Sequence, residues 1–482
     1  MNPIYSFWAD AAAEPDRVAL VDSHGKSFTA GEILSSANQI VHGLRSMGFS
    51  KGDAVAAVIM NEVEMVELFM AIAQAGMYLT PVNWHLTAPE IAYILEDSRS
   101  RVLVCSPEFA DVCADACSQA DLSDDLRFCT VEHSGFRHFR ELKEGQPTTP
   151  PDERVAGTPM HYTSGTTGKP KGVRRQLPAV PPEAISTGYA QFLQLFGIPP
   201  GHEAVHLTVA PLYHTAVLNF TTSSLHLGHK VVLMKKWTPL GTLERIHEYG
   251  VTHTHMVPTQ FVRLLTLDKE ARESYNVESL AQVIHGAAPC PMEIKRQMLD
   301  WWGPVIFEYY AATEGGGAII SAGEWLEKPG SVGKAWPGSV IEIFDDEGQV
   351  CAPGTVGTVY MCMGEHTFEY HGDKEKTDQA WKDRFFTVGD AGYLDEDGYL
   401  FLVDRKSDMI ISGGVNIYPA EIESVLIMHP DVADVAVFGV PDDDWGESVM
   451  AVVEPLEGVA SGPGLSSSIQ EFAEGRLAKY KR

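Results

Sequence analysis

Positive charge is scarce in this sequence. Its 36 Lys and Arg residues are outnumbered by 65 Asp and Glu residues, which gives a formal net charge of −29. Binding to nucleic acid, or to an anionic lipid surface, requires a net basic face. The composition therefore predicts no nucleic-acid partner. Small anionic ligands are not excluded, because local hydrogen-bond donors can capture them.

Cysteines and long apolar runs are also few. The seven cysteines form no CxxC pair, and the four between residues 105 and 129 lack the spacing of a zinc site, so we interpret them as reduced thiols. No run approaches the ~20 apolar residues of a membrane span. The N-terminus shows no basic segment followed by an apolar one. The sequence therefore predicts a cytoplasmic protein with no integral membrane segment.

The pattern of apolar residues predicts an α/β fold. Residues 54–60 form a short apolar strand, and Asn61 is a suitable N-cap for a helix that Gly76 ends before a second strand. Strands and helices continue to alternate to about residue 266, which is typical of mostly parallel sheets. At 482 residues the chain is too long for one core.

The pattern changes twice in the second half of the chain. From about residue 340, short alternating strands separated by Asp and Gly predict a small β-rich subdomain. After residue 404, a strand, a Gly-Gly turn, a helix and two more strands predict a small α+β domain. We therefore expect a large domain over residues 1–404, made of two α/β subdomains and the β-rich subdomain, and a smaller domain over 405–482.

The segment YTSGTTGKPKGV at residues 162–173 predicts a phosphate site. It contains four Ser or Thr hydroxyls, three glycines and two lysines, but almost nothing apolar to bury. Glycines let backbone N–H groups approach an anion, while hydroxyls and ammonium groups donate to it. The spacing is not that of a P-loop, because two residues separate its first two glycines and Pro170 follows Lys169. The candidate ligands are Thr163, Ser164, Gly165, Thr166, Thr167, Gly168, Lys169 and Lys171.

Two later segments add candidates for nucleotide binding. Residues 307–317, FEYYAATEGGG, are predicted to end a strand in a glycine-rich turn, which is where open α/β sheets bind ligands. Glu314 offers carboxylate oxygens suited to Mg²⁺, and Tyr310 offers a flat face for a base. In the segment TVGD at 387–390, the carboxylate of Asp390 can accept two hydrogen bonds at once.

Taken together, these segments resemble the adenylate-forming (ANL) superfamily of acyl- and aryl-CoA synthetases, luciferases and peptide-synthetase adenylation domains. The motifs occur in the family's order over about residues 20–482, and the segment 162–173 matches almost letter for letter. Ala311 stands where the family usually has Gly, and Ser407 stands at the position of the hinge residue, which is more often Asp or Lys.

The resemblance implies a role for each matching residue. Tyr310 would lie on adenine, Thr313 would touch phosphate, Glu314 would bind Mg²⁺, and Lys171 would act with them in catalysis. Asp390 and Arg405 would contact ribose, and Gly286, Ala287 and Ala288 would line the adenine pocket. His214 would gate the acyl pocket, and Gly413 and Gly414 would line the CoA tunnel of a mobile lid.

The implied reaction uses ATP, Mg²⁺ and coenzyme A to convert a carboxylic acid into acyl-AMP and then acyl-CoA. The segments around Tyr213 and Tyr309 look most like bacterial fatty-acyl-CoA synthetases. An aryl-CoA ligase of the 4-coumarate kind, an acyl-AMP ligase that loads a carrier protein, a luciferase-like oxidation and a non-catalytic homologue remain alternatives, and a homodimer is left open. The family's adenylation lysine would follow Arg482, so we expect the lid in this sequence to be incomplete.

Overall fold

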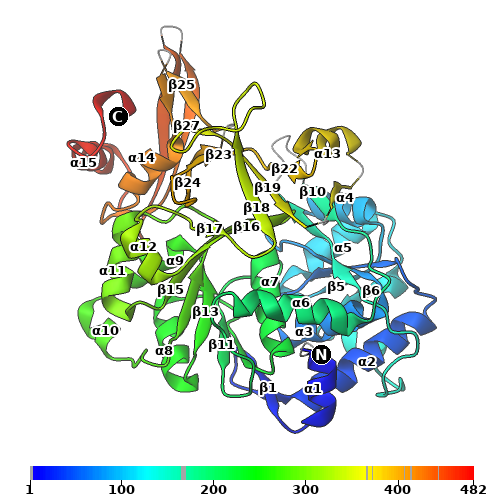
Figure 1. Cartoon of the computed structure of the whole chain (residues 1–482). Coiled ribbons are helices and arrows are strands. Elements are labelled where there is room, and N and C mark those ends of the chain that lie inside the picture. The colour runs from blue at the N-terminus through cyan, green and yellow to red at the C-terminus, as the bar shows by residue number, and fades with distance from the viewer. Residues whose placement is uncertain are drawn as a thin grey trace. The chain divides into compact units, whose positions relative to one another are not determined.

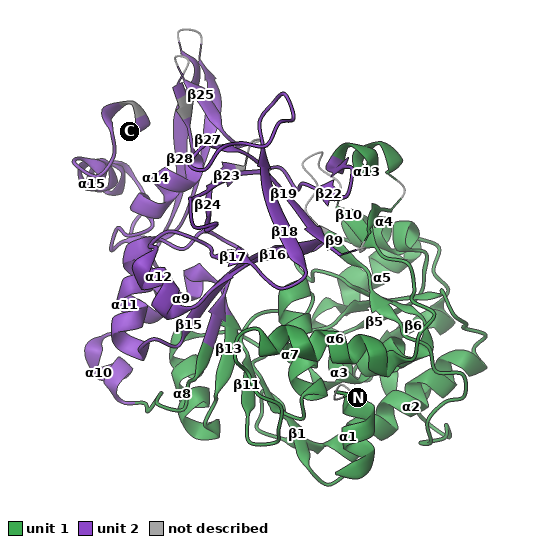
Figure 2. Ribbon diagram, in the orientation of Figure 1, with its two compact units in different colours: residues 1–255, 275–282, 367–379 green, residues 256–274, 283–366, 380–482 purple. Residues whose placement is uncertain are grey.

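A computed structural model of the chain describes residues 4–163, 170–364, 367–371, 373–405, 408–412, 415–442 and 445–482. The chain divides into two compact units (Figures 1 and 2). Unit 1 comprises residues 1–255, 275–282 and 367–379, and unit 2 comprises residues 256–274, 283–366 and 380–482. Short segments of distant sequence therefore complete each unit.

A six-stranded parallel sheet forms one half of unit 1, with the strand order β7-β6-β5-β3-β4-β8. Alternate residues of β3 point to opposite faces. Val55 and Ala57 pack with α2 and α3, whereas Ala56 and Val58 pack with α4 and α5. The sheet is thus covered by helices on both faces, which explains why β3 is apolar and buried along its whole length. The strands are β3 (Ala54–Val58), β4 (Tyr78–Pro81), β5 (Ser100–Cys105), β6 (Arg127–Cys129), β7 (Arg137–His138) and β8 (Thr158–Pro159).

A second group of strands in unit 1 has the order β13-β11-β12-β1-β2, parallel except for the β1–β2 pair. These strands are β1 (Val18–Val21), β2 (Ser27–Thr29), β11 (Val205–Thr208), β12 (Lys230–Leu233) and β13 (His253–Met256). The helices of the unit are α1 (Phe7–Ala13), α2 (Ala30–Ser46), α3 (Val63–Ala75), α4 (Ala88–Ser98), α5 (Ala110–Gln119), α6 (Pro182–Gln194), α7 (Thr215–His226), α8 (Pro239–Tyr249) and α13 (Lys374–Ala380).

The start of α3 differs from the sequence prediction. Glu62 is the N-cap residue, without a side-chain cap, whereas the helix does end at Gly76 in the left-handed conformation. The Asn61 amide instead donates to the carbonyls of Ala210 and Met234, and its oxygen accepts from the Leu212 amide. A buried side chain that must satisfy distant backbone groups is not available to cap its own helix.

Unit 2 begins with strands β14 (Gln282–His285), β15 (Ile306–Ala312), β16 (Gly315–Ile320) and β17 (Lys334–Ala335) in that spatial order. Only the β14–β15 pair of this run is parallel. The β-rich subdomain that the sequence predicts is an antiparallel sheet. It contains β18 (Ser339–Phe344), β19 (Gly357–Met363), β21 (Trp381–Lys382), β22 (Phe385–Phe386), β23 (Asp390–Leu394) and β24 (Leu400–Arg405).

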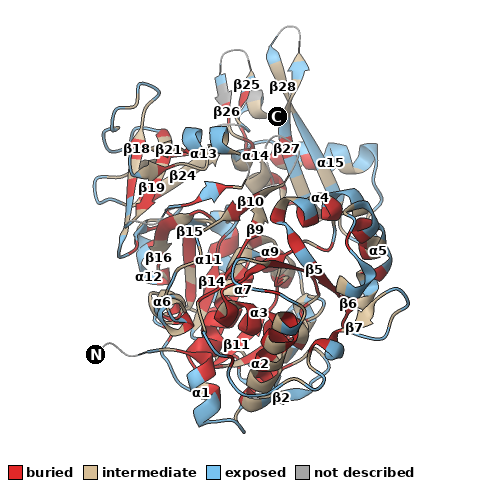
Figure 3. Ribbon diagram, turned by 90° about the vertical axis from the view of Figure 1, so that its right-hand side faces the viewer, coloured by how far each residue is buried: buried red, intermediate tan, exposed pale blue. Residues whose placement is uncertain are grey.

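The last part of unit 2 is the predicted α+β region, a four-stranded antiparallel sheet in the order β26-β25-β28-β27. One face of β27 and β28 packs on α14 and α15 through Val437, Ile422 and Ile469. Figure 3 shows the contrast between the buried α3 and α7 and the more exposed β27 and β28. The elements are β25 (Ile410–Ser412), β26 (Val415–Ile417), β27 (Val432–Asp442), β28 (Gly446–Pro455), α14 (Pro419–Leu426) and α15 (Pro463–Ala473).

The remaining helices of unit 2 are α9 (Pro258–Leu265), α10 (Lys269–Glu273), α11 (Met292–Trp302) and α12 (Ala322–Glu327). Among the residues that the structure describes, no helix is long and apolar enough to cross a membrane. The boundary between residues 404 and 405 remains a prediction.

Candidate functional site

The phosphate segment is carried by a hairpin in unit 1. Strands β9 (His161–Thr163) and β10 (Lys171–Arg174) are antiparallel, and Thr163 lies opposite Lys171. The predicted ligands from Ser164 to Lys169 connect these strands and lie outside the described residues. Gly172 is closely packed, since a Cβ atom there would lie 2.3 Å from Cε of Met160 and would force that side chain to move.

Carboxylates anchor this hairpin on both strands. The Lys171 ammonium lies 2.6 Å from Oδ2 of Asp373, at the start of α13. On β9, the Tyr162 hydroxyl donates to Oδ2 of Asp97 at 2.6 Å. Burial and the neighbouring Asp97 raise the pKa of Tyr162, so it remains a donor. The hydrogen bonds from Lys171 and from the Lys376 amide lower the pKa of Asp373, so it is ionised at neutral pH.

Thr313 and Glu314 form the tight turn between β15 and β16 in unit 2. The predicted strand end is confirmed, but Gly315 already belongs to β16, so the turn is shorter than expected. A Cβ atom at Gly317 would lie 2.1 Å from the Tyr310 carbonyl oxygen and 2.5 Å from the Trp336 ring. Gly317 therefore lets β15 and the Trp336 indole approach β16 closely, and Glu314 in the adjoining turn is 9% exposed.

The residues predicted to bind adenine and ribose meet in unit 2. The Tyr310 hydroxyl donates to Oδ2 of Asp390 at 2.6 Å, although the two are 80 positions apart. Asp390 begins β23 and lies directly opposite Arg405 at the end of β24. Strand pairing thus brings Asp390 and the backbone of Arg405 together, and the hydrogen bond adds the ring of Tyr310.

The predicted adenine-pocket turn follows β14. Gly286 is buried, and a Cβ atom there would lie 2.7 Å from the Tyr309 ring, so only glycine fits. Ala287 has φ of +68°, a left-handed conformation that costs free energy for a residue with a side chain. Ala287 and Ala288 are exposed. Such strain is found preferentially at functional sites, and the role of this turn in adenine binding stays a prediction.

His214 lies at the N-cap of α7 in unit 1 and is exposed. Its ring lies 4.4 Å from that of Tyr213, which makes an edge-on contact with Trp84 at 4.7 Å. Sequence reasoning did not identify Trp84, because no local motif marks a contact over this separation. His253 and His255 are buried in β13.

The predicted residues are thus divided between the units. Thr163, Lys171 and His214 belong to unit 1, whereas residues 286–288, 310–314, 390 and 405 belong to unit 2. Gly413 and Gly414, predicted to admit CoA, lie outside the described residues.

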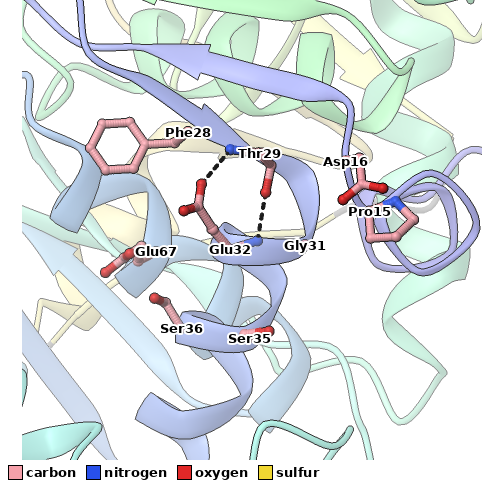
Figure 4. A pocket seen from close by; sticks show the side chains of 9 residues that line it. All are labelled: Pro15, Asp16, Phe28, Thr29, Gly31, Glu32, Ser35, Ser36 and Glu67. Carbon is pink, nitrogen blue, oxygen red and sulfur yellow. Dashed lines mark hydrogen bonds between the residues drawn. The ribbon is translucent and has the colours of Figure 1, made fainter.

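A hollow of about 580 Å³ in unit 1 contains none of these residues (Figure 4). Two of its carboxylates, those of Glu32 and Glu67, already have partners within the fold. Thr29 and Glu32 form the capping box of α2, and Glu67 pairs with Lys143 at 2.8 Å. We therefore do not assign the hollow to the candidate site.

Sequence reasoning also missed a buried ion pair between α11 and β15. The Lys295 ammonium of α11 lies 2.5 Å from Oε2 of Glu308 and 4.7 Å from the centre of the Trp325 ring. Both charged groups are less than 10% exposed. Burial lowers the pKa of Lys295 and raises that of Glu308, and their mutual attraction opposes both shifts.

The fold of the chain is that of an adenylate-forming enzyme. A family model described as AMP-binding enzyme matches residues 7–369, and one described as AMP-binding enzyme C-terminal domain matches residues 421–482. The chain belongs to this family, and its resemblance to the ANL superfamily is confirmed.

Individual relatives differ in the acids and acceptors that they use. The fatty acid–[acyl-carrier-protein] ligase ScoC of Streptomyces coeruleorubidus is 31% identical over 98% of this chain and 89% of its own length. The indoleacetate–CoA ligase of Aromatoleum aromaticum is 32% identical, covering 99% and 92%. The o-succinylbenzoate CoA synthetase MenE of Bacillus subtilis, solved with the acyl-adenylate OSB-AMP, has a TM-score of 0.82 at 28% identity, covering 100% and 93%. The same enzyme has been solved with ATP and magnesium ion.

Proposed function

We propose that this protein activates a carboxylic acid, preferably a fatty acid, with ATP and transfers the acyl group to coenzyme A. The observation that carries the proposal is the hydrogen bond between Tyr310 and Asp390. An aromatic face joined to a carboxylate suits a nucleoside, because the ring can stack on the base while the carboxylate accepts from ribose hydroxyls.

In the first step, a carboxylate oxygen of the acid attacks the α-phosphorus of ATP, and pyrophosphate leaves with the electrons of the broken P–O bond. Lys171 and the donors of the 163–171 segment stabilise the negative charge that develops on the leaving phosphates. Thr313 is proposed to donate a hydrogen bond from its hydroxyl to phosphate. The strands of the hairpin fix where this segment begins and ends.

Glu314 is the proposed Mg²⁺ ligand. Among the described residues, no group of three or more His, Cys, Asp or Glu residues could hold a metal ion. This fits Mg²⁺, which uses one or two carboxylates and takes its other ligands from nucleotide phosphates and water. When bound, the ion would neutralise charge on the transferring phosphate.

In the second step, the sulfur of CoA attacks the acyl carbonyl carbon, AMP leaves, and the thiol proton passes to solvent. Residues 405–482 would act as the lid, with Gly413 and Gly414 lining the CoA tunnel, while Arg405 and Asp390 retain the ribose. His214 would gate the acyl group.

The alternative to a fatty acid is an aromatic acid, and the alternative to CoA is a carrier protein. The ScoC relative supports the fatty acid, whereas the indoleacetate and o-succinylbenzoate ligases support the aromatic acid. Synthetic adenylates of fatty acids of increasing length and of aryl acids, each supplied with CoA, test the choice. We expect thioester and AMP to form fastest from a fatty acyl-adenylate. Turnover of aryl adenylates alone, or transfer to a carrier protein but not to CoA, would contradict the proposal.

A further inference from the structure

We propose that Asp373 is a positioning residue that holds the Lys171 ammonium in the orientation needed to meet the ATP phosphates. This inference rests on the proposed role of Lys171. Asp373 was not part of any motif in the sequence, and it lies 202 positions from its partner.

The two carboxylate oxygens of Asp373 accept hydrogen bonds from different donors. Oδ1 accepts from the Lys376 amide at 3.0 Å, and the Asp373 carbonyl accepts from the Thr377 amide at 3.1 Å, as expected at the start of a helix. Oδ2 accepts from the Lys171 ammonium at 2.6 Å. Because α13 fixes the first oxygen, it also fixes the second.

The segment that carries Asp373 is locked to the strand that carries Lys171. Strand β20 (Glu369–Tyr370) pairs with β10, so that Tyr370 lies opposite Val173. The His371 amide continues this pairing by donating to the Gly172 carbonyl at 2.9 Å. The Tyr370 amide donates to the Thr377 hydroxyl at 3.0 Å, which ties α13 back to the strand. The carboxylate therefore has a defined place relative to the Lys171 backbone.

A defined carboxylate matters because a lysine side chain has many rotamers. Ordering it costs conformational entropy, which a phosphate would otherwise have to offset on binding. The Lys171 side chain is only 14% exposed, whereas that of Asp373 is 34% exposed. An ammonium has three N–H donors, so one bond to Asp373 orients the group without exhausting its capacity to donate.

Asp373→Asn separates the helix-capping role of Asp373 from its ion pair with Lys171. Asparagine is as good an N-cap as aspartate, so α13 is retained while the charge facing Lys171 is lost. Asp378→Asn is the matched control, because Asp378 lies on the same helix and pairs with Lys374 at 2.9 Å in an exposed position. In ATP–pyrophosphate exchange, we expect Asp373→Asn to lower kcat about 10-fold, the scale of one charge-assisted hydrogen bond. Asp378→Asn should leave kcat unchanged.

A double-mutant cycle distinguishes positioning from a structural role. In a Lys171→Ala background, Asp373→Asn should cause no further loss, because its effect passes through Lys171. A similar loss in both backgrounds, or unchanged or faster exchange by Asp373→Asn alone, would overturn the inference. Near-normal exchange by Lys171→Ala would instead refute the proposed role of Lys171 itself, and this inference with it.

Discussion

Lys171 and Glu314 supply opposite charges to the proposed phosphate chemistry, and each can be removed singly. We expect Lys171→Ala and Glu314→Gln to reduce ATP–pyrophosphate exchange by roughly 100-fold or more, the scale for losing a preorganised charge contact. Lys374→Ala and Glu347→Gln, at exposed positions, are the controls. If the folded variants exchanged at near-normal rates, the phosphate and Mg²⁺ roles would be wrong.

Tyr310 has two proposed contributions, its ring and its hydroxyl. Tyr310→Phe keeps the ring but removes the 2.6 Å hydrogen bond to Asp390. We expect the KM for ATP to rise about 5-fold with little change in kcat, as for one hydrogen bond of about 1 kcal/mol. Tyr393→Phe is the control, since it keeps its stacking on Phe401. A fall in kcat with an unchanged KM would show that the hydroxyl acts in the chemical step instead.

Most elements could be predicted from the sequence, because their signals are local. The helix from Pro239 to Tyr249 belongs to the predicted alternation of strands and helices, and the strand from Gly357 to Met363 is one of the short strands predicted after residue 340. Asn61 shows where local signals fail, since its partners lie about 150 or more positions away. Gly317 in β16 shows the same limit, because a Cβ atom there would meet the Trp336 ring, which no local signal indicates.

The buried pair of Lys295 and Glu308 joins α11 to β15, the strand that carries Tyr310. Lys295→Met should destabilise the protein by about 3–5 kcal/mol, because it leaves Glu308 buried without its partner charge. The double variant Lys295→Met/Glu308→Leu should recover much of this loss. Urea-induced unfolding measures both. If the double variant were as unstable as the single one, packing rather than the unpaired charge would explain the loss.

Buried histidines around β11, β13 and α7 make stability depend on pH. Burial lowers the pKa of His206, His226 and His255 to about 3 each and that of His229 to about 4. These rings stay neutral in the folded state, whereas in the unfolded state they take up protons below about pH 6.5. The contribution of these rings to the free energy of unfolding is therefore fully present above that pH and is lost as the pH falls from 6.5 towards 4.

Each such ring contributes a slope of about 1.4 kcal/mol per pH unit in that window. The free energy of unfolding, measured in urea between pH 7.5 and 5, should decrease as the pH is lowered. His206→Gln should make this decrease less steep. His24→Gln, at an exposed position, should not. An unchanged slope for His206→Gln would mean that His206 does not remain neutral in the folded protein.

At the scale of the whole molecule, the candidate site was predictable where its residues form contiguous motifs. The hairpin at 163–171, the Thr313–Glu314 turn and Asp390 each have a local signature. Their supporting residues have no such local signature. Asp373 contacts Lys171 across 202 positions of sequence, and Trp84, which follows β4, contacts Tyr213, which follows β11. Such contacts follow from the order and register of strands, which one sequence does not specify.

The central claim is that the acid is activated as an acyl-adenylate, and the fate of a carboxylate oxygen tests it most directly. The protein is incubated with ATP, Mg²⁺, CoA and a fatty acid labelled with ¹⁸O in its carboxyl group. If a carboxylate oxygen attacks the α-phosphorus and CoA then attacks the carbonyl carbon, one labelled oxygen must remain on AMP. We predict one ¹⁸O atom in each AMP released and none in pyrophosphate. Label in inorganic phosphate with formation of ADP, or thioester formation with unlabelled AMP, would contradict the account.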